Sequence, residues 1–188
     1  MDNTKLKVIN LFGAPGSGKS KIAQLIAGIS FRYNHNIQYV DEYVKKLCWE
    51  QSNKKRFENQ VLVTAEQYTK QLVLLENNIE YCVTDSPIIL GTLYSPETYF
   101  NTYNKLCFEL FESFTNYNFL IKRGDFVYET VGRNEDEASS NILHHHQQTT
   151  LLINNNYDFT IITNSDALDA AMQILQLVFC VDNNSQLY

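Results

Sequence analysis

Near its amino terminus the chain reads Gly13-Ala14-Pro15-Gly16-Ser17-Gly18-Lys19-Ser20. This stretch fits the pattern GxxxxGK[ST] at every fixed position. An apolar run at 7–12 precedes it, and apolar residues at helical spacing follow it, so the pattern lies between an expected strand and an expected helix. Glycines let backbone N–H groups wrap a phosphate, and the helix presents its positive amino-terminal end. The stretch therefore predicts that residues 13–20 bind a nucleoside triphosphate.

Three side chains in and near this stretch are candidates for phosphate and metal chemistry. We expect Lys19 to reach the β- and γ-phosphates of ATP and the Ser20 hydroxyl to ligate Mg²⁺. Asp85 closes an expected hydrophobic strand at 80–84, where proteins with this loop place the acid that holds the metal or its water. A turn-forming aspartate ahead of Ser86 and Pro87 is the alternative. We predict that Ser20 and Asp85 together hold magnesium.

Two carboxylates, Asp41 and Glu42, follow the next expected strand, at 37–40. In a parallel sheet, residues just past the carboxyl ends of the strands line the ligand crevice. A carboxylate there can accept the proton of an attacking hydroxyl as a general base. The alternative is a solvated acidic pair that favours the start of a helix. Of the two residues we prefer Glu42 as the base.

The order of expected elements predicts an α/β fold. Strands are expected at 7–12, 37–40, 80–84, 117–121 and 158–162. Helices are expected between or after them at 18–33, 43–51, 57–78, 96–113, 136–153 and 166–179. Alternation of this kind forms a mostly parallel sheet, here of five strands, with helices on both faces.

Length, composition and charge limit the class of protein. The 188 residues, 44% of them hydrophobic, are expected to form a single domain with one sizeable core and a polar tail at about 181–188. Apolar runs are too short to cross a bilayer, and a signal peptide is not evident, so we expect a cytoplasmic protein without membrane partners. A net charge of −6 disfavours proteins that coat nucleic acid nonspecifically. The four cysteines are widely spaced and are expected to be reduced core residues.

The chain resembles the small P-loop kinases of the nucleoside and nucleotide kinase class, especially the nicotinamide-riboside-kinase-like ATPases of bacteria and phages. The resemblance spans residues 6–179, and the phosphate loop is its most specific part. The other matching residues are Asp41-Glu42-Tyr43, Gln67, Thr84-Asp85-Ser86-Pro87, Gly132-Arg133 and the acidic segment 134–138.

This resemblance implies a P-loop NTPase three-layer fold with a short lid at about 123–137. It implies that Arg133, and after it Arg123, stabilises charge on the transferring phosphoryl group. It places Glu42 at the acceptor site and Gln67 near the substrate. The chain departs from the Asp-Arg-Ser of deoxynucleoside kinases, because Ser86 follows Asp85 directly.

The function we predict is ATP- and Mg²⁺-dependent phosphoryl transfer to a hydroxyl of a nucleoside, nucleotide or related small molecule. A basic run begins just after Glu42; its members are Lys45, Lys46, Lys54, Lys55 and Arg56. Solvated helix surface explains such a run, but its position also fits a phosphorylated or polymeric acceptor. The run supports one alternative, a kinase acting on a hydroxymethylated pyrimidine within phage DNA. Two more alternatives stay open: a regulatory ATPase with no acceptor, and a fold kept for structure alone.

Overall fold

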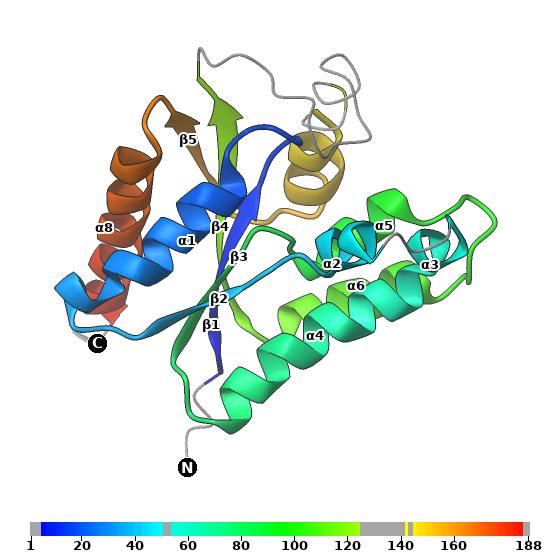
Figure 1. Ribbon diagram of the computed structural model, residues 1–188, viewed down its shortest axis with the longest axis horizontal. Helices are drawn as coiled ribbons and strands as arrows, with labels where there is room; N and C mark the ends of the chain where they lie inside the picture. The colour runs from blue at the N-terminus through cyan, green and yellow to red at the C-terminus, as the bar shows by residue number, and fades with distance from the viewer. Residues whose placement is uncertain (1–4, 51–53, 125–141, 143–144, 186–188) are drawn as a thin grey trace.

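A five-stranded sheet forms the centre of the molecule (Figure 1), which we describe from a computed structural model over residues 5–50, 54–124, 142 and 145–185. The strand order is β2-β3-β1-β4-β5, and all four pairs of neighbours are parallel. The strands are β1 (Lys7–Phe12), β2 (Ile37–Val40), β3 (Tyr81–Thr84), β4 (Thr115–Arg123) and β5 (Thr160–Asn164). The central strands β1 and β3 are buried almost throughout, as near-continuous apolar runs in a parallel sheet require. The expected α/β fold is confirmed.

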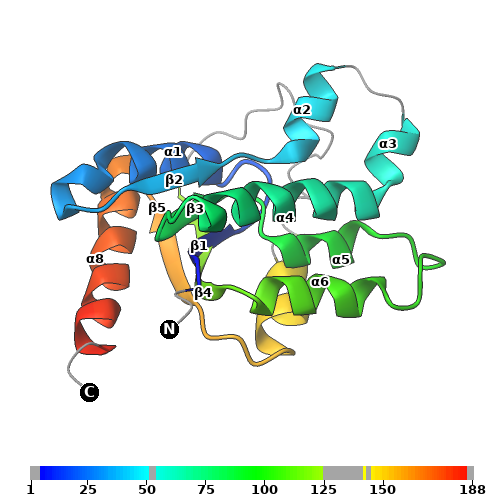
Figure 2. The same ribbon diagram turned by 90° about the horizontal axis from the view of Figure 1, so that it is seen from below.

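Helices cover both faces of this sheet, so the molecule has three layers (Figure 2). The layer on one face consists of α1 (Lys19–Ile29) and α8 (Ala167–Ser185). The other elements of the described chain are η1 (Ser30–Tyr33), α2 (Tyr43–Trp49), α3 (Lys54–Glu58), α4 (Gln60–Glu76), η2 (Ile88–Leu90), α5 (Gly91–Tyr94), α6 (Tyr103–Glu112) and η3 (Gln147–Ile153). Of these, α4, α6, η2 and η3 lie on the opposite side of the sheet from α1 and α8.

The alternating side chains of β1 explain why both faces need a covering layer. Ile9 and Leu11 belong to the core beneath α1 and α8. Val8 and Phe12 belong to the clusters on the opposite face. Successive residues of a strand point to opposite sides, so a strand with apolar side chains on both sides, such as β1, needs a covering layer on each face.

The helices differ from the sequence-based expectation in three places. The helix expected at 57–78 is interrupted at Asn59, whose side chain accepts a hydrogen bond from Leu62 N at 3.1 Å and caps α4. The helix expected to begin at residue 96 begins at Tyr103, because turns occupy the residues before it. The short helices η2 and α5 were not expected. Helix α8 continues past Phe179 to Ser185 and includes part of the expected tail, a segment without glycine or proline.

Only two of the four cysteines are core residues. Cys82 and Cys107 are buried, and burial raises the pKa of both thiols. Cys48 on α2 and Cys180 on α8 are exposed, which corrects the expectation that the cysteines are core residues. None of the four, all within the described residues, forms a disulfide bond. In the described part of the chain, no helix combines the length and apolar character needed to cross a bilayer.

Candidate active site

The glycine-rich loop joins β1 to α1 at the carboxyl edge of the sheet. Gly13, Gly16 and Gly18 have φ angles of 135°, 85° and 87°, a region that side-chain-bearing residues rarely adopt. A Cβ atom on Gly13 would lie 2.5 Å from the backbone oxygen of Ile121 in β4. The chain therefore turns tightly over the end of β4 and directs the amino terminus of α1 at the space inside the loop, an arrangement suited to a phosphate.

The side chain of Lys19 folds back into this loop. Its Nζ donates hydrogen bonds to the carbonyl oxygens of Gly13 at 2.7 Å and Ala14 at 2.9 Å. The ammonium group thus lies where the loop would surround a phosphate. Its role in binding the β- and γ-phosphates stays a prediction.

Ser20, in the first turn of α1, contacts Asp85, which directly follows β3. The Ser20 hydroxyl donates a hydrogen bond to Asp85 Oδ2, and the Asp85 side chain is only 1% exposed. Asp85 lies just past β3, and β3 pairs in parallel with β1, so its carboxylate reaches the first turn of α1. Lys45 Nζ lies 2.8 Å from the same carboxylate oxygen and also donates to the Ser20 hydroxyl.

The charge state of Asp85 follows from these contacts. Burial raises the pKa of a carboxyl group, but Lys45, the Ser20 hydroxyl and the charge of Lys19 favour the ionised form. Their combined effect outweighs burial and lowers the pKa of Asp85 below its ordinary value. Asp85 is therefore an anion at neutral pH.

Ser20 and Asp85 have the donor chemistry that Mg²⁺ requires. Mg²⁺ prefers hard oxygen ligands and is usually held by one or two carboxylates, with phosphates and water completing the shell. Asp85 Oδ1 is buried and has no hydrogen-bond partner among the described residues, so a carboxylate oxygen remains for a ligand. In the described chain, no cluster of three His, Cys, Asp or Glu side chains forms a separate metal site.

The two candidate bases separate at the end of β2. Glu42 precedes α2, is 33% exposed, and has its Oε2 atom 3.8 Å from Lys45 Nζ. Asp41 is 59% exposed and pairs with Lys70, whose Nζ lies 2.6 Å from its Oδ1. Lys45 thus links Glu42 to Asp85, whereas Asp41 is held away by a lysine of α4.

Gln67 of α4 connects the two halves of this site. It is buried, and its Nε2 donates to Thr84 Oγ1 at 3.1 Å at the end of β3. Its Oε1 accepts from the backbone N–H of Tyr43, at the start of α2, at 3.4 Å. Gln67 therefore fixes the start of α2 against the strand that carries Asp85, a positioning role in keeping with its predicted place near the substrate.

Two residues that the sequence did not single out support the loop from behind. Gln147 of η3 is buried, and its Oε1 accepts a hydrogen bond from Gly13 N at 2.6 Å. Asn164, the last residue of β5, donates from Nδ2 to Ser17 O at 2.8 Å. Both lie beyond the expected lid in the sequence, and no sequence motif connects either of them to the loop.

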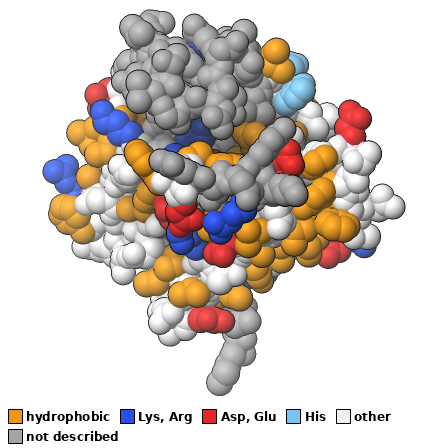
Figure 3. Space-filling model, turned by 45° about the vertical axis from the view of Figure 1, so that its right-hand side comes forward, with side chains coloured by type: hydrophobic (Ala, Val, Ile, Leu, Met, Phe, Trp, Pro, Cys, Tyr) orange, Lys and Arg blue, Asp and Glu red, His pale blue; other side chains and the backbone are white. Residues whose placement is uncertain are grey.

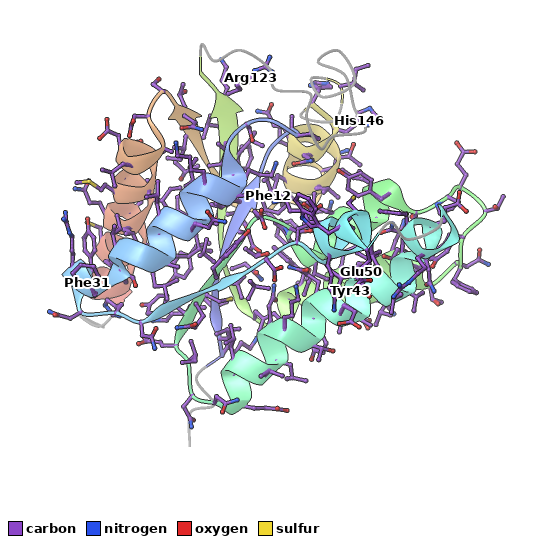
Figure 4. The ribbon with its side chains drawn as sticks, viewed as in Figure 1. Phe12, Phe31, Tyr43, Glu50, Arg123 and His146 are labelled. Atoms are coloured by element: carbon purple, nitrogen blue, oxygen red, sulfur yellow. The ribbon has the colours of Figure 1, made fainter. Side chains whose placement is uncertain are left out.

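The lid is only partly within the described residues. Arg123 ends β4, and Figure 4 shows it at the tip of that strand, away from Tyr43 at the start of α2 and Glu50 just after its end. Arg133 and residues 125–137 of the expected lid lie outside the described part of the chain. The structure thus brings together Lys19, Ser20, Asp85 and Glu42, and does not bring Asp41 or Arg123 into that group.

The basic run after Glu42 divides into residues with different surroundings. Lys46 and Arg56 both pair with Glu50, at 3.9 Å and 3.4 Å, as solvated helix surfaces do. On the face turned forward in Figure 3, acidic and basic side chains lie next to one another. Lys45, in contrast, contacts Ser20 and Asp85. The sequence could not identify Lys45, because adjacent lysines look alike until the direction of the helix is known.

The chain matches a protein family in sequence and several solved structures in fold. The AAA domain family matches residues 8–168. No curated protein matches the chain significantly. Thymidylate kinase from Candida albicans has a TM-score of 0.61 at 12% identity, covering 95% of this chain and 93% of that one. Thymidylate kinase from Ehrlichia chaffeensis has a TM-score of 0.60 at 13% identity, covering 92% and 99%.

A third similar structure is shikimate kinase from Acinetobacter baumannii in complex with shikimate. Its TM-score is 0.55 at 17% identity, with 94% of this chain and 95% of that chain covered. At such identities the likeness concerns the fold. It agrees with the P-loop three-layer fold that the resemblance implied.

Proposed function

The chain belongs to the AAA domain family, and from this premise we propose that it is a magnesium-dependent kinase. It would transfer the γ-phosphoryl group of ATP to a hydroxyl of a nucleoside, a nucleotide or a related small molecule. The observation that carries the proposal is the contact of Ser20 with the buried carboxylate of Asp85, directly beside a glycine loop that holds Lys19. Phosphoryl transfer depends chiefly on positioned charge, and this arrangement supplies it.

On the nucleotide side, the residues of this chain have separate tasks. The loop N–H groups and Lys19 would bind the β- and γ-phosphates, and Lys19 would exchange its two carbonyl contacts for phosphate oxygens. Ser20 and Asp85 would hold Mg²⁺, which when bound neutralises charge between the β- and γ-phosphates. Arg133 and Arg123 remain the proposed arginines of the lid.

On the acceptor side, Glu42 is the proposed base. Its carboxylate is half-buried and is held towards the Ser20–Asp85 pair through Lys45. There it can orient the attacking hydroxyl and accept its proton. Asp41 is the weaker candidate, because Lys70 already occupies its carboxylate.

A screen with labelled ATP tests this proposal. Nucleosides, nucleotides, nicotinamide riboside and DNA containing hydroxymethylated pyrimidines serve as acceptors. We expect transfer to one of the small molecules, and Lys19→Ala is expected to reduce it by about 10²–10³-fold, the share of one electrostatic contact. Lys21→Ala is the matched control, since Lys21 is exposed on the same helix. A rate of ATP hydrolysis that no added acceptor changes would instead indicate a regulatory ATPase. Absence of ATP binding would indicate a structural role.

One observation favours DNA as the acceptor. Trp49, at the end of α2, is 87% exposed and follows the basic run's first members. An exposed aromatic ring beside cationic side chains can stack on a base, with about 1–3 kcal/mol per stack. On this alternative, Trp49→Ala lowers transfer to modified DNA and leaves transfer to a free nucleoside unchanged. Equal effects on both acceptors would remove the alternative.

A further inference from the structure

The ammonium group of Lys45 lies among oxygen atoms that belong to the metal site. Its Nζ is 2.8 Å from Asp85 Oδ2, donates to the Ser20 hydroxyl, and is 3.8 Å from Glu42 Oε2. These oxygens come from α1, the end of β3 and the residue before α2, so the packing of three elements creates the cluster. Two of these three side chains, Ser20 and Asp85, are the ones with the ligand chemistry that fits Mg²⁺. A cation of the chain itself therefore lies against the two side chains, Ser20 and Asp85, that the proposed metal would need.

The burial of the partners shows which group is fixed and which can move. Asp85 is 1% exposed and carries a charge that must be balanced, because an unpaired buried carboxylate is costly. The side chain of Lys45 is 45% exposed and has a flexible stem, so its ammonium can return to water at little cost. Gln67 anchors the backbone of α2 at Tyr43, so the exchange requires only a change of side-chain rotamer.

We propose that Lys45 is a positioning residue that holds the metal's place in the nucleotide-free chain and is displaced when the metal binds. The inference rests on the magnesium site of the proposed function. Lys45 balances the charge of Asp85 and orients the Ser20 hydroxyl while the site holds no metal. A Mg²⁺ ion held by Ser20 and Asp85 would lie next to this ammonium group, and repulsion between the two cations would drive the ammonium group away from Asp85. It remains near Glu42, which lies three residues before it and is thereby held on the acceptor side.

The consequence is a chain that binds divalent metal weakly in the absence of nucleotide, because each metal ion must first displace Lys45. Removal of this single positive charge, close to the carboxylate, should tighten binding of the metal alone on the order of 10- to 100-fold. The same removal should destabilise the metal-free chain, since Asp85 then lacks its counter-charge. Added metal should restore that stability.

The test uses MnCl₂ alone, without nucleotide, in isothermal titration calorimetry and thermal melting. Lys45→Met keeps the length of the side chain and removes its charge. We expect this variant to bind Mn²⁺ more tightly than the natural chain and to melt at a lower temperature without metal. Its melting temperature should also rise more on addition of Mn²⁺. Lys45→Arg, which retains the charge, should bind Mn²⁺ as weakly as the natural chain. Lys46→Met is the matched control, because Lys46 pairs with Glu50 at the surface.

Equal Mn²⁺ affinity in Lys45→Met and the natural chain would overturn the proposal, as would equal tightening by Lys46→Met. If Lys45→Met does not fold, Lys45→Gln, which can still donate a hydrogen bond to Asp85, replaces it in the same comparison. The experiment needs neither acceptor nor turnover. Tighter Mn²⁺ binding without kinase activity would therefore keep this inference and remove the proposed reaction, whereas activity without tightening would do the reverse.

Discussion

Replacing Gly13 by alanine tests the path of the phosphate loop. At φ 135° a residue with a side chain is strained, and the added Cβ would lie 2.5 Å from Ile121 O and 3.0 Å from Ser17 Oγ. Ile121 lies in β4 and pairs with Ile162 of β5, and this pairing limits how far its carbonyl group can retreat. A strained backbone costs about 1–3 kcal/mol, and an overpacked site costs a similar amount.

We therefore expect Gly13→Ala to lower the free energy of unfolding by about 2–6 kcal/mol, a large part of the stability of an ordinary domain. Urea unfolding at an unchanged m-value measures it. Gly28→Ala is the control, because an added Cβ on this exposed residue of α1 meets nothing within 4 Å. It should stabilise the chain by about 0.5–1 kcal/mol. If the free energy of unfolding of Gly13→Ala lies within about 1 kcal/mol of that of the natural chain, the described path of the loop is wrong.

Three further predictions concern the acceptor base, the support of the loop and the thiols. Glu42→Gln should leave ATP binding intact and reduce phosphoryl transfer by about 10²–10⁴-fold, while Asp41→Asn should change it less; normal transfer in both variants would exclude this base. Gln147→Leu leaves the N–H of Gly13 buried without its partner, so urea unfolding should show a loss of about 1–3 kcal/mol, and an unchanged midpoint would contradict the contact. A thiol reagent should modify the two exposed cysteines in the folded chain and all four in urea, and a faster third thiol would refute the described burial.

Much of the architecture could be predicted from the sequence, because hydrophobic runs and the glycine loop are local signals. Both β1 and β3 are apolar at successive positions, and Asp85 directly follows such a run. The break at Asn59 was missed because a capping asparagine inside a long helical pattern is recognised only by its bond to Leu62 N. The spacing of apolar residues does not show whether a helix continues through an asparagine or begins again after it.

The sequence predicted candidate site residues in the loop motif and directly after expected strands, but not those that tertiary packing brings to the site. Lys19 and Ser20 lie in the loop itself, and the end of a strand pointed to Asp85. The role of Lys45 depends on the direction in which α2 leaves Glu42, and Lys46 has the same chemistry one residue later. Tertiary packing, rather than residue type, decides which of two adjacent lysines reaches a buried carboxylate.

The contacts of Gln147 and Asn164 with the loop have a consequence for the order in which the chain is made. Gly13 and Ser17 leave the ribosome early, but the side chains that bond to them are 134 and 147 residues further along. The first amide of the loop lacks its buried acceptor until Gln147 of η3 has been translated, and the carbonyl of Ser17 lacks its donor until Asn164 of β5 has been translated. The phosphate loop is thus synthesised well before the residues that fix its final geometry, so the loop is completed only when η3 and β5 have joined the fold.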